Sequence, residues 1–96
     1  MEIKRNNTFV STSFWGDTIF TNAKELIKLF GDYKESDPLK VNYEWNLILD
    51  NKIPFSIYDW KEPDLTMTQD INYHIGARNE KESKEIAKVL NKIINN

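Results

Sequence analysis

The sequence predicts an α+β fold, a two-layer sandwich in which two helices cover one face of an antiparallel sheet of about four strands. Residues 41–49 and 53–57 alternate apolar with other side chains, the period of half-buried strands. Residues 22–30 and 79–96 carry apolar residues at helical spacing and capping signals at their starts. The predicted order is strand, helix, three strands, helix. One apolar sheet face then needs cover, which two amphipathic helices provide.

The length of 96 residues predicts a single domain. Hydrophobic residues make up 40% of the chain and charged residues 29%, the composition of a globular rather than a disordered protein. Uninterrupted apolar runs reach only two or three residues, so no transmembrane span is predicted. The first residues, MEIKRNN, lack the apolar segment of a signal peptide, and the predicted location is therefore the cytoplasm.

Composition also excludes several kinds of site. The chain has no cysteine, which excludes disulfides, a thiol nucleophile and thiolate metal ligands. Its single histidine, His74, excludes a multi-histidine metal site within one chain. The 13 basic and 15 acidic residues are evenly spread and leave a net charge of −2, too balanced for a general nucleic-acid binder or a DNA mimic. We therefore predict no metal, no cofactor and no general nucleic-acid binding.

The first elements are a predicted strand and a short helix. Residues 8–20, TFVSTSFWGDTIF, are rich in strand formers, and the strand is expected to break or bend near Gly16. The helix that follows is capped by Thr21 or Asn22 and ends at Gly31, because only glycine adopts the left-handed conformation there at little cost. Its apolar positions are Ala23, Leu26, Ile27 and Phe30.

A polar loop over residues 32–38 leads to the clearest pattern in the chain. In KVNYEWNLILD the strand's core side is predicted to carry Val41, Tyr43, Trp45, Leu47 and Leu49. Asp50–Lys52 is predicted to be a hairpin turn, since Asp and Asn tolerate positive φ. The return strand places on its apolar side Ile53, Phe55 and Ile57, and on its other side Pro54, Ser56, Tyr58 and Trp60.

The last elements are a third strand and a second helix. Residues 63–70 form a loop long enough to act as a flap, and residues 71–77 form a strand that Gly76 ends. Its core side carries Ile71, Tyr73 and Ile75, and its other side Asn72 and His74. The helix over residues 79–96 is capped by Asn79. Its apolar stripe comprises Ile86, Val89, Leu90, Ile93 and Ile94.

The strand phases predict which side chains share the sheet face that points away from the helices. Pairing about the Asp50–Lys52 turn, with the third strand beside the second, brings polar groups and two large aromatic rings together on this face. The predicted neighbours are Asn46 with Ser56, Glu44 with Tyr58 and Asn42 with Trp60, joined by Asn72 and His74. No other segment of the chain is expected to cover this face, which we call the open face.

Such a face suits a planar, polar ligand of nucleotide type, because aromatic rings stack on bases and basic groups meet phosphates. The candidate ligand-binding residues are Tyr58 and Trp60 for stacking, Glu44 and His74 for hydrogen bonds, and Lys61, Arg78 or the basic start IKR for phosphate. A small domain offers one shallow face, so a homo-oligomer is expected to be needed to enclose a ligand.

Two other interpretations of the same aromatic residues stay open. Tryptophan and tyrosine are the usual anchors of protein interfaces, so this face, or the first helix, would also suit a protein partner. Alternatively, Tyr58 and Trp60 pack against each other, against Trp15 or under the 63–70 loop, since aromatic side chains carry much of any small core.

A hydrolase is a third hypothesis. His74 would be its general base, oriented by Glu44 or Asp59 and acting on Ser56 or Tyr58. The sequence has no nucleophile elbow, phosphate loop or pair of catalytic carboxylates to accompany it. A lone histidine in a strand is more often a hydrogen-bonded structural residue, so the chain is predicted not to be an enzyme.

One acidic residue departs from the strand pattern. Asp59 falls in the apolar phase of its strand. It is predicted to lie beyond the edge of the core, to pair with Lys61 or Arg78, or to cap a turn, and the capping role is expected in preference to a functional one.

Three stretches of the chain resemble a set of small proteins from phages and large viruses. They are LIKLFGDY, VNYEWNLILDNKIPFSIYDWKE and INYHIGA, and the resemblance spans about residues 26–94. The shared features are a short helix ending in FG, a hairpin ending in IYDWK and a later strand similar to WHIGG. The matching positions are Phe30, Gly31, Glu44, Trp45, Ile57, Tyr58, Asp59, Trp60, Lys61, His74, Ile75 and Gly76. Tyr73 stands where the pattern has Trp, and Ala77 where it has a second Gly.

The resemblance implies a viral context. Small phage proteins without enzymatic motifs often bind a component of host immunity stoichiometrically, and this step is an analogy. It predicts a phage counter-defence protein in the host cytoplasm that sequesters a nucleotide-type immune signal. The alternative is direct inhibition of a host defence protein.

Overall fold

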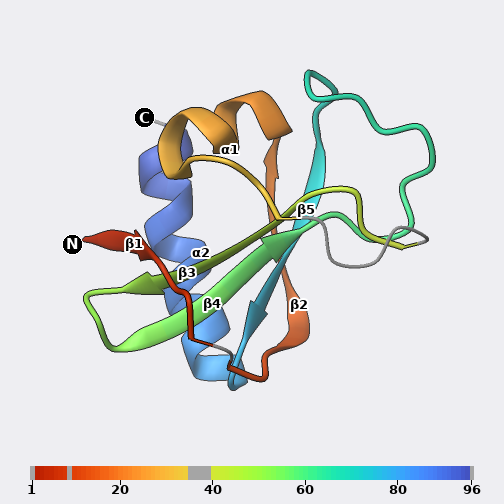
Figure 1. The fold of residues 1–96 in the computed structure, drawn as a ribbon. Coiled ribbons are helices and arrows are strands. Elements are labelled where there is room, and N and C mark those ends of the chain that lie inside the picture. The colour runs from red at the N-terminus through yellow and green to blue at the C-terminus, as the bar shows by residue number, and fades with distance from the viewer. Residues whose placement is uncertain (1, 9, 35–39, 96) are drawn as a thin grey trace.

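A computed structural model of the chain describes residues 2–8, 10–34 and 40–95. The elements run in the order β1 (Ile3–Arg5), β2 (Ser13–Thr21), α1 (Ala23–Phe30), β3 (Glu44–Leu49), β4 (Ile53–Tyr58), β5 (Ile71–Ala77) and α2 (Glu80–Ile94). The five strands form one antiparallel sheet with the spatial order β1-β3-β4-β5-β2 (Figure 1). The predicted α+β class is confirmed, with one strand more than expected.

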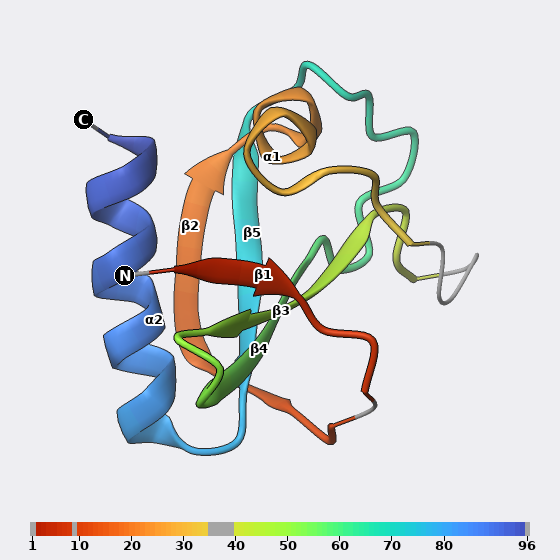
Figure 2. The ribbon, with the colours of Figure 1, turned by 60° about the vertical axis from the view of Figure 1, so that its left-hand side comes forward.

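The core lies between the two helices and one face of the sheet. Figure 2 shows α2 on one side of β2 and β5, and the segment that follows β1 on the other side. The apolar phases predicted for the strands are buried on the helix side, including Trp45, Leu47, Phe55, Ile57, Tyr73 and Ile75. They pack with Ala23 and Leu26 of α1 and with Ile86 and Leu90 of α2. Burial of these side chains is the main force that holds the two layers together.

The hairpin has the predicted register where β3 and β4 pair, but the pairing ends at Glu44 and Tyr58, so the predicted neighbours Asn42 and Trp60 lie outside it. Glu44 lies opposite Tyr58, and Asn46 lies opposite Ser56. Asp50 and Asn51 adopt φ values of 52° and 57°, the left-handed conformation that both central residues of a type I′ turn require. The backbone N–H of Lys52 donates to the Leu49 carbonyl at 2.9 Å and closes the turn.

The helix boundaries follow the predicted capping residues. The Asn22 side chain accepts from the backbone N–H of Glu25 at 2.9 Å, and Gly31 ends α1 with a φ of 90°. The Asn79 side chain likewise accepts from the backbone N–H of Glu82 at 2.9 Å. The predicted stripe on α2 is wrong at one position, because Ile93 is 38% exposed and lies beside the buried face rather than on it.

The N-terminal region differs from its prediction. A strand beginning at residue 8 is wrong, because β2 begins at Ser13, and residues 8 and 10–12 are not strand. The bend near Gly16 is confirmed, since the pairing with β5 shifts register between Phe14 and Thr18. Strand β1 was not predicted, because its three residues are too few to show a pattern. Gly76 does not end β5, which continues to Ala77.

The loop predicted over residues 32–38 falls partly on residues 35–39, which lie outside the described residues. Of the rest, Tyr33 packs edge-on against Tyr43 at 4.7 Å between ring centroids. Lys34 and Glu44 exchange two backbone hydrogen bonds of 2.7 and 3.1 Å. This end of the loop is therefore attached to the sheet through its backbone and Tyr33, while the charged side chains of Asp32 and Lys34 are exposed.

Asp59 caps the segment that enters β3, and capping was one of its predicted roles. Its carboxylate is fully buried and accepts from the backbone N–H groups of Asn42 and Tyr43, the shortest bond being 2.7 Å. The Asn42 side-chain amide donates to the same carboxylate at 2.9 Å and also to the Glu62 carbonyl at 2.9 Å. Asp59 is therefore buried rather than beyond the edge of the core, and among the described residues no ion pair joins it to Lys61 or Arg78.

The loop over residues 63–70 is attached at several points and is not a free flap. Leu65 is buried in the core, and the backbone N–H of Lys24 donates to the Met67 carbonyl at 2.8 Å. The Asn22 side chain donates to the Asp70 carboxylate at 2.8 Å. These contacts tie the loop to the start of α1.

We expect Asp59→Ala to lower the free energy of unfolding by about 3 kcal/mol, because it leaves two backbone N–H groups without acceptors at about 1–3 kcal/mol each. Urea denaturation monitored by circular dichroism measures this loss. The control is Asp32→Ala at an exposed position, which should change stability by less than about 0.5 kcal/mol. Equal effects of the two substitutions would contradict a capping role for Asp59.

Candidate functional site

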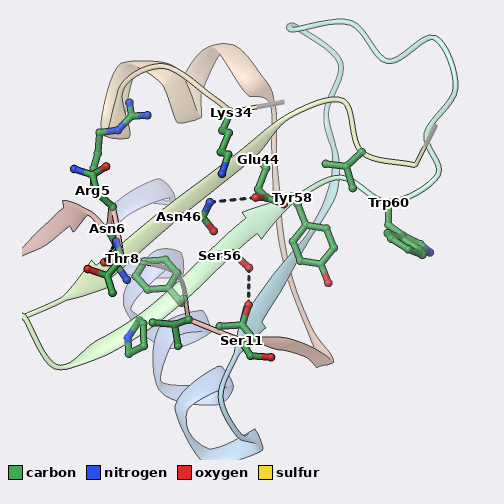
Figure 3. Close-up of a pocket in the computed structure, with 16 residues that line it drawn as sticks. Arg5, Asn6, Thr8, Ser11, Lys34, Glu44, Asn46, Ser56, Tyr58 and Trp60 are labelled. Atoms are coloured by element: carbon green, nitrogen blue, oxygen red, sulfur yellow. Dashed lines mark hydrogen bonds between the residues drawn. The ribbon is translucent and has the colours of Figure 1, made fainter. Parts of the chain in front are cut away.

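A pocket of about 790 Å³ lies on the sheet face opposite the helices (Figure 3). Its floor comes from β3 and β4, and one wall comes from the segment between β1 and β2. Figure 3 shows Tyr58 and Trp60 at one end of the pocket and Arg5 and Asn6 at the other. Residues that line it are Arg5, Asn6, Asn7, Thr8, Val10, Ser11, Thr12, Lys34, Val41, Glu44, Asn46, Pro54, Phe55, Ser56, Tyr58 and Trp60.

The expectation that no segment of the chain covers the open face is wrong. Pro54 and Ser56 are buried although they point away from the helices, and the Thr12 hydroxyl lies 3.3 Å from the Ser56 hydroxyl. A Cβ atom at Gly76 would overlap the Ser56 hydroxyl and approach the Thr12 hydroxyl to 3.0 Å. Glycine at this position therefore lets the N-terminal segment approach the sheet closely and close one side of the pocket.

Glu44 and Asn46 supply hydrogen-bonding groups on the pocket floor. The Asn46 side-chain amide donates to the Glu44 carboxylate at 3.1 Å, which orients both groups. The backbone of Glu44 is held by its pairing with Lys34, and Figure 3 shows the Lys34 side chain directed toward these two residues. This part of the pocket therefore combines a carboxylate, an amide and an ammonium group.

The two aromatic residues stand together at the other end. The ring of Tyr58 meets that of Trp60 edge-on, with 6.4 Å between centroids and an interplanar angle of 81°. Trp60 is 41% exposed, and the Nζ atoms of Lys40 and Lys61 each lie 5.7 Å from its ring centroid. Both lysines are at cation–π distance. Burial, and then the Glu44 carboxylate, raise the pKa of Tyr58, so its hydroxyl is a neutral donor at pH 7.

His74 lies next to Tyr58 but outside the pocket lining. One face of its ring is stacked on Phe14 at 3.9 Å between centroids and 14° between planes. Its ring meets Tyr58 edge-on at 5.4 Å. Desolvation lowers the pKa of His74, against a smaller upward effect of the Glu62 and Asp59 carboxylates. The neutral imidazole continues a row of aromatic rings across three strands.

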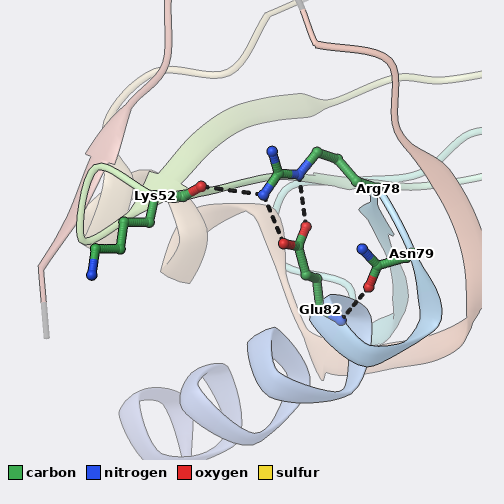
Figure 4. A network of polar contacts seen from close by, with 4 residues as sticks. All are labelled: Lys52, Arg78, Asn79 and Glu82. Carbon is green, nitrogen blue, oxygen red and sulfur yellow. Dashed lines mark hydrogen bonds and ion pairs between the residues drawn. The ribbon is translucent and has the colours of Figure 1, made fainter.

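Arg78 is not brought to the pocket. Its guanidinium donates to both carboxylate oxygens of Glu82 at 2.8 and 2.7 Å, and to the Lys52 carbonyl at 3.3 Å (Figure 4). These partners lie at the hairpin turn and the start of α2. Of the predicted site residues, the pocket gathers Glu44, Tyr58 and Trp60, and Lys61 stands beside Trp60.

The N-terminal wall and two of the basic groups were missed by sequence reasoning. Residues 6–8 and 10–12 are polar apart from Val10. A polar stretch indicates exposed chain, but it does not indicate which face of the sheet that chain crosses. Lys34 and Lys40 belong to a predicted solvated loop and its border. Arg5 is the one member of the basic start IKR that lines the pocket.

In residues 2–8, 10–34 and 40–95, no three His, Cys, Asp or Glu side chains are grouped as a metal ion would need. None of the helices in these ranges is long and apolar enough to cross a membrane.

The chain was also compared with protein-family models, curated proteins and solved structures, and it matches none of them. The resemblance to small viral proteins therefore stays a prediction.

The partly buried environment of His74 should be visible in its pKa. In an NMR titration of this single histidine we expect a pKa below the ordinary value of about 6.5. Phe14→Ala should raise it, because the phenyl ring shields the imidazole from water. Phe20→Ala, which removes an exposed ring from the same strand, is the control and should leave it unchanged.

The lowered pKa of His74 should also make the stability of the fold depend on pH. The folded chain binds the proton less readily than the unfolded chain, so the free energy of unfolding should fall as the pH drops through about 6.5. Acid unfolding of His74→Phe should lack this component. A native pKa at or above the ordinary value would contradict the prediction.

Proposed function

We propose that this protein is a binding protein that captures a small ligand of nucleotide type in the pocket between the sheet and the N-terminal segment. The observation that carries the proposal is that Tyr58 and Trp60 stand together at one end of that pocket, with Lys40 and Lys61 each 5.7 Å from the Trp60 ring centroid. Exposed aromatic rings provide stacking surfaces for bases, and lysines beside them neutralise phosphates.

The pocket floor supplies the remaining contacts. Asn46 and Glu44 present amide and carboxylate groups that match the donors and acceptors on a base edge. Lys34 beside these two residues, and Arg5 at the end opposite Trp60, add positive charge for a second phosphate. A ligand with phosphates on both sides of a base would meet complementary groups along the whole pocket.

Binding rather than catalysis is proposed because the groups near His74 are already engaged. Phe14 covers one face of the imidazole, and the Asp59 carboxylate is occupied by Asn42 and Tyr43. A general base needs a positioned substrate and a group that orients it. Phe14 occupies one face of the His74 ring, and the Asp59 carboxylate is taken by backbone N–H groups, so neither is arranged to serve His74 as a base.

The biological role rests on the resemblance to small phage and viral proteins. A phage protein of this kind would sequester a nucleotide immune signal in the cytoplasm of its host, stoichiometrically and without a cofactor. This context is an analogy, and a homo-oligomer would help to enclose the ligand.

Calorimetric titration with cyclic dinucleotides, cyclic oligonucleotides and cyclic ADP-ribose isomers tests the proposal. We expect one of these classes to bind, and Trp60→Ala to weaken it about 5- to 150-fold, from about 1–3 kcal/mol of stacking. Trp15→Ala is the matched control, because Trp15 is 43% exposed and does not line the pocket. No binding by folded protein, or equal losses in the two variants, would overturn the proposal.

A second candidate is direct inhibition of a host defence protein. It is favoured by the exposure of Trp60, since an exposed tryptophan on a rigid turn is a typical interface anchor. Affinity capture from host lysate should then yield a stoichiometric protein complex that Trp60→Ala abolishes and Trp15→Ala preserves. A complex that survives both substitutions would exclude this surface.

A further inference from the structure

The two edges of the sheet are protected to different degrees. An edge strand presents unpaired backbone N–H and C=O groups, and proteins blunt such edges with short strands, charge, proline or bulges. Strand β1 at one edge has three residues, of which Lys4 and Arg5 are basic. Strand β2 at the other edge has nine residues and contains no lysine, arginine or proline. Edge β2 is therefore the one left open to pairing.

The second half of β2 is the regular part. Thr18–Thr21 pair residue by residue with β5, whereas the Gly16 region carries the register shift. The only charge on β2, Asp17, is turned toward α2, where its carboxylate accepts from the Ser83 hydroxyl at 2.7 Å and lies 3.9 Å from Lys84 Nζ. No charge on the strand therefore interferes with pairing along Thr18–Thr21.

Apolar exposure is concentrated on the same strand. Among the described residues, β2 carries three of the seven large hydrophobic side chains that are exposed, and Phe20 is the most exposed at 59%. Phe14 and Trp15 are each 43% exposed. A strand that combines a free backbone edge with exposed aromatic rings is a typical site for the addition of another strand.

We propose that Thr18–Thr21 of β2 pairs antiparallel with the same segment of a second copy of this chain, giving a two-fold dimer with one continuous sheet of ten strands. The charge pattern fits pairing of two copies at this edge and not at the β1 edge. Self-pairing places like residues near each other, which is harmless for an uncharged Thr-Ile-Phe-Thr segment but would oppose Lys4 and Arg5 at the β1 edge.

The strand phase restricts the geometry. Opposed residues must share a sheet face, so the two-fold axis passes at a residue and not between two residues. Near the middle of the segment, an axis at Phe20 opposes it to its own copy, and an axis at Ile19 opposes Phe20 to Thr18 of the second copy. Either arrangement covers Phe20 and places the two ligand pockets on the same side of the joined sheet.

Sedimentation velocity over a concentration series tests this proposal. We expect wild-type protein to show a concentration-dependent dimer, and Phe20→Lys and Thr18→Lys to remain monomeric with unchanged circular dichroism. Leu29→Lys on α1 is the matched control, because Leu29 is exposed but lies off the edge, and it should dimerise as the wild type does. A wild-type monomer up to about 1 mM, or a dimer that survives both edge substitutions, would overturn the proposal.

A crosslinking measurement keeps the proposal testable if a lysine variant fails to fold. The chain has no cysteine, so a single introduced thiol is unique. Phe20→Cys alone, or an equimolar mixture of Thr18→Cys and Phe20→Cys, should form an intermolecular disulfide much faster than Leu29→Cys. Equal rates for all of them would contradict pairing through β2.

This dimer does not depend on the ligand. Phe20→Lys lies outside the pocket, so calorimetry on this variant separates the two proposals. If the variant is monomeric and still binds a nucleotide, the pocket does not need the dimer. If the wild-type protein dimerises but binds none of the nucleotides, the dimer proposal holds and the proposed function fails.

Discussion

The register of the β3–β4 hairpin is the constraint on which the rest of the molecule depends. The type I′ turn at Asp50 and Asn51 opposes Glu44 to Tyr58, and this pairing sends Trp45 and Ile57 into the core. A slip by one residue would exchange the two faces, burying carboxylate and amide groups and exposing the core. Core formation and the pocket floor are therefore two results of one register.

The buried carboxylate of Asp59 extends this register beyond the hairpin. It holds the backbone of Asn42 and Tyr43, while the Asn42 amide holds the Glu62 carbonyl on the other side of Trp60. Trp60 consequently leaves the sheet on a turn that is fastened at both ends. Because the backbone on both sides of Trp60 is held before any ligand arrives, binding has less backbone entropy to overcome.

The distribution of charge explains how a chain with a net charge of −2 would bind an anion. Lys34, Lys40 and Lys61 stand near the pocket, while Glu82 is occupied by Arg78 at the far end of β5. Local potential, rather than net charge, sets the affinity of a small site. The even charge along the sequence therefore argues against a general nucleic-acid surface but not against a compact phosphate site.

Sequence by itself determined the elements whose signals are local: the strand alternation of residues 44–57, the caps Asn22 and Asn79, and the end of α1 at Gly31. It also determined which side of the hairpin carries Glu44 and Tyr58, because side-chain phase and turn type are properties of neighbouring residues. Only the tertiary structure decided that residues 6–8 and 10–12 cover the open face, that Phe14 stacks on His74, and that Arg78 turns to Glu82. These contacts join positions far apart in the chain or depend on competition between partners, and no periodicity in a sequence records either.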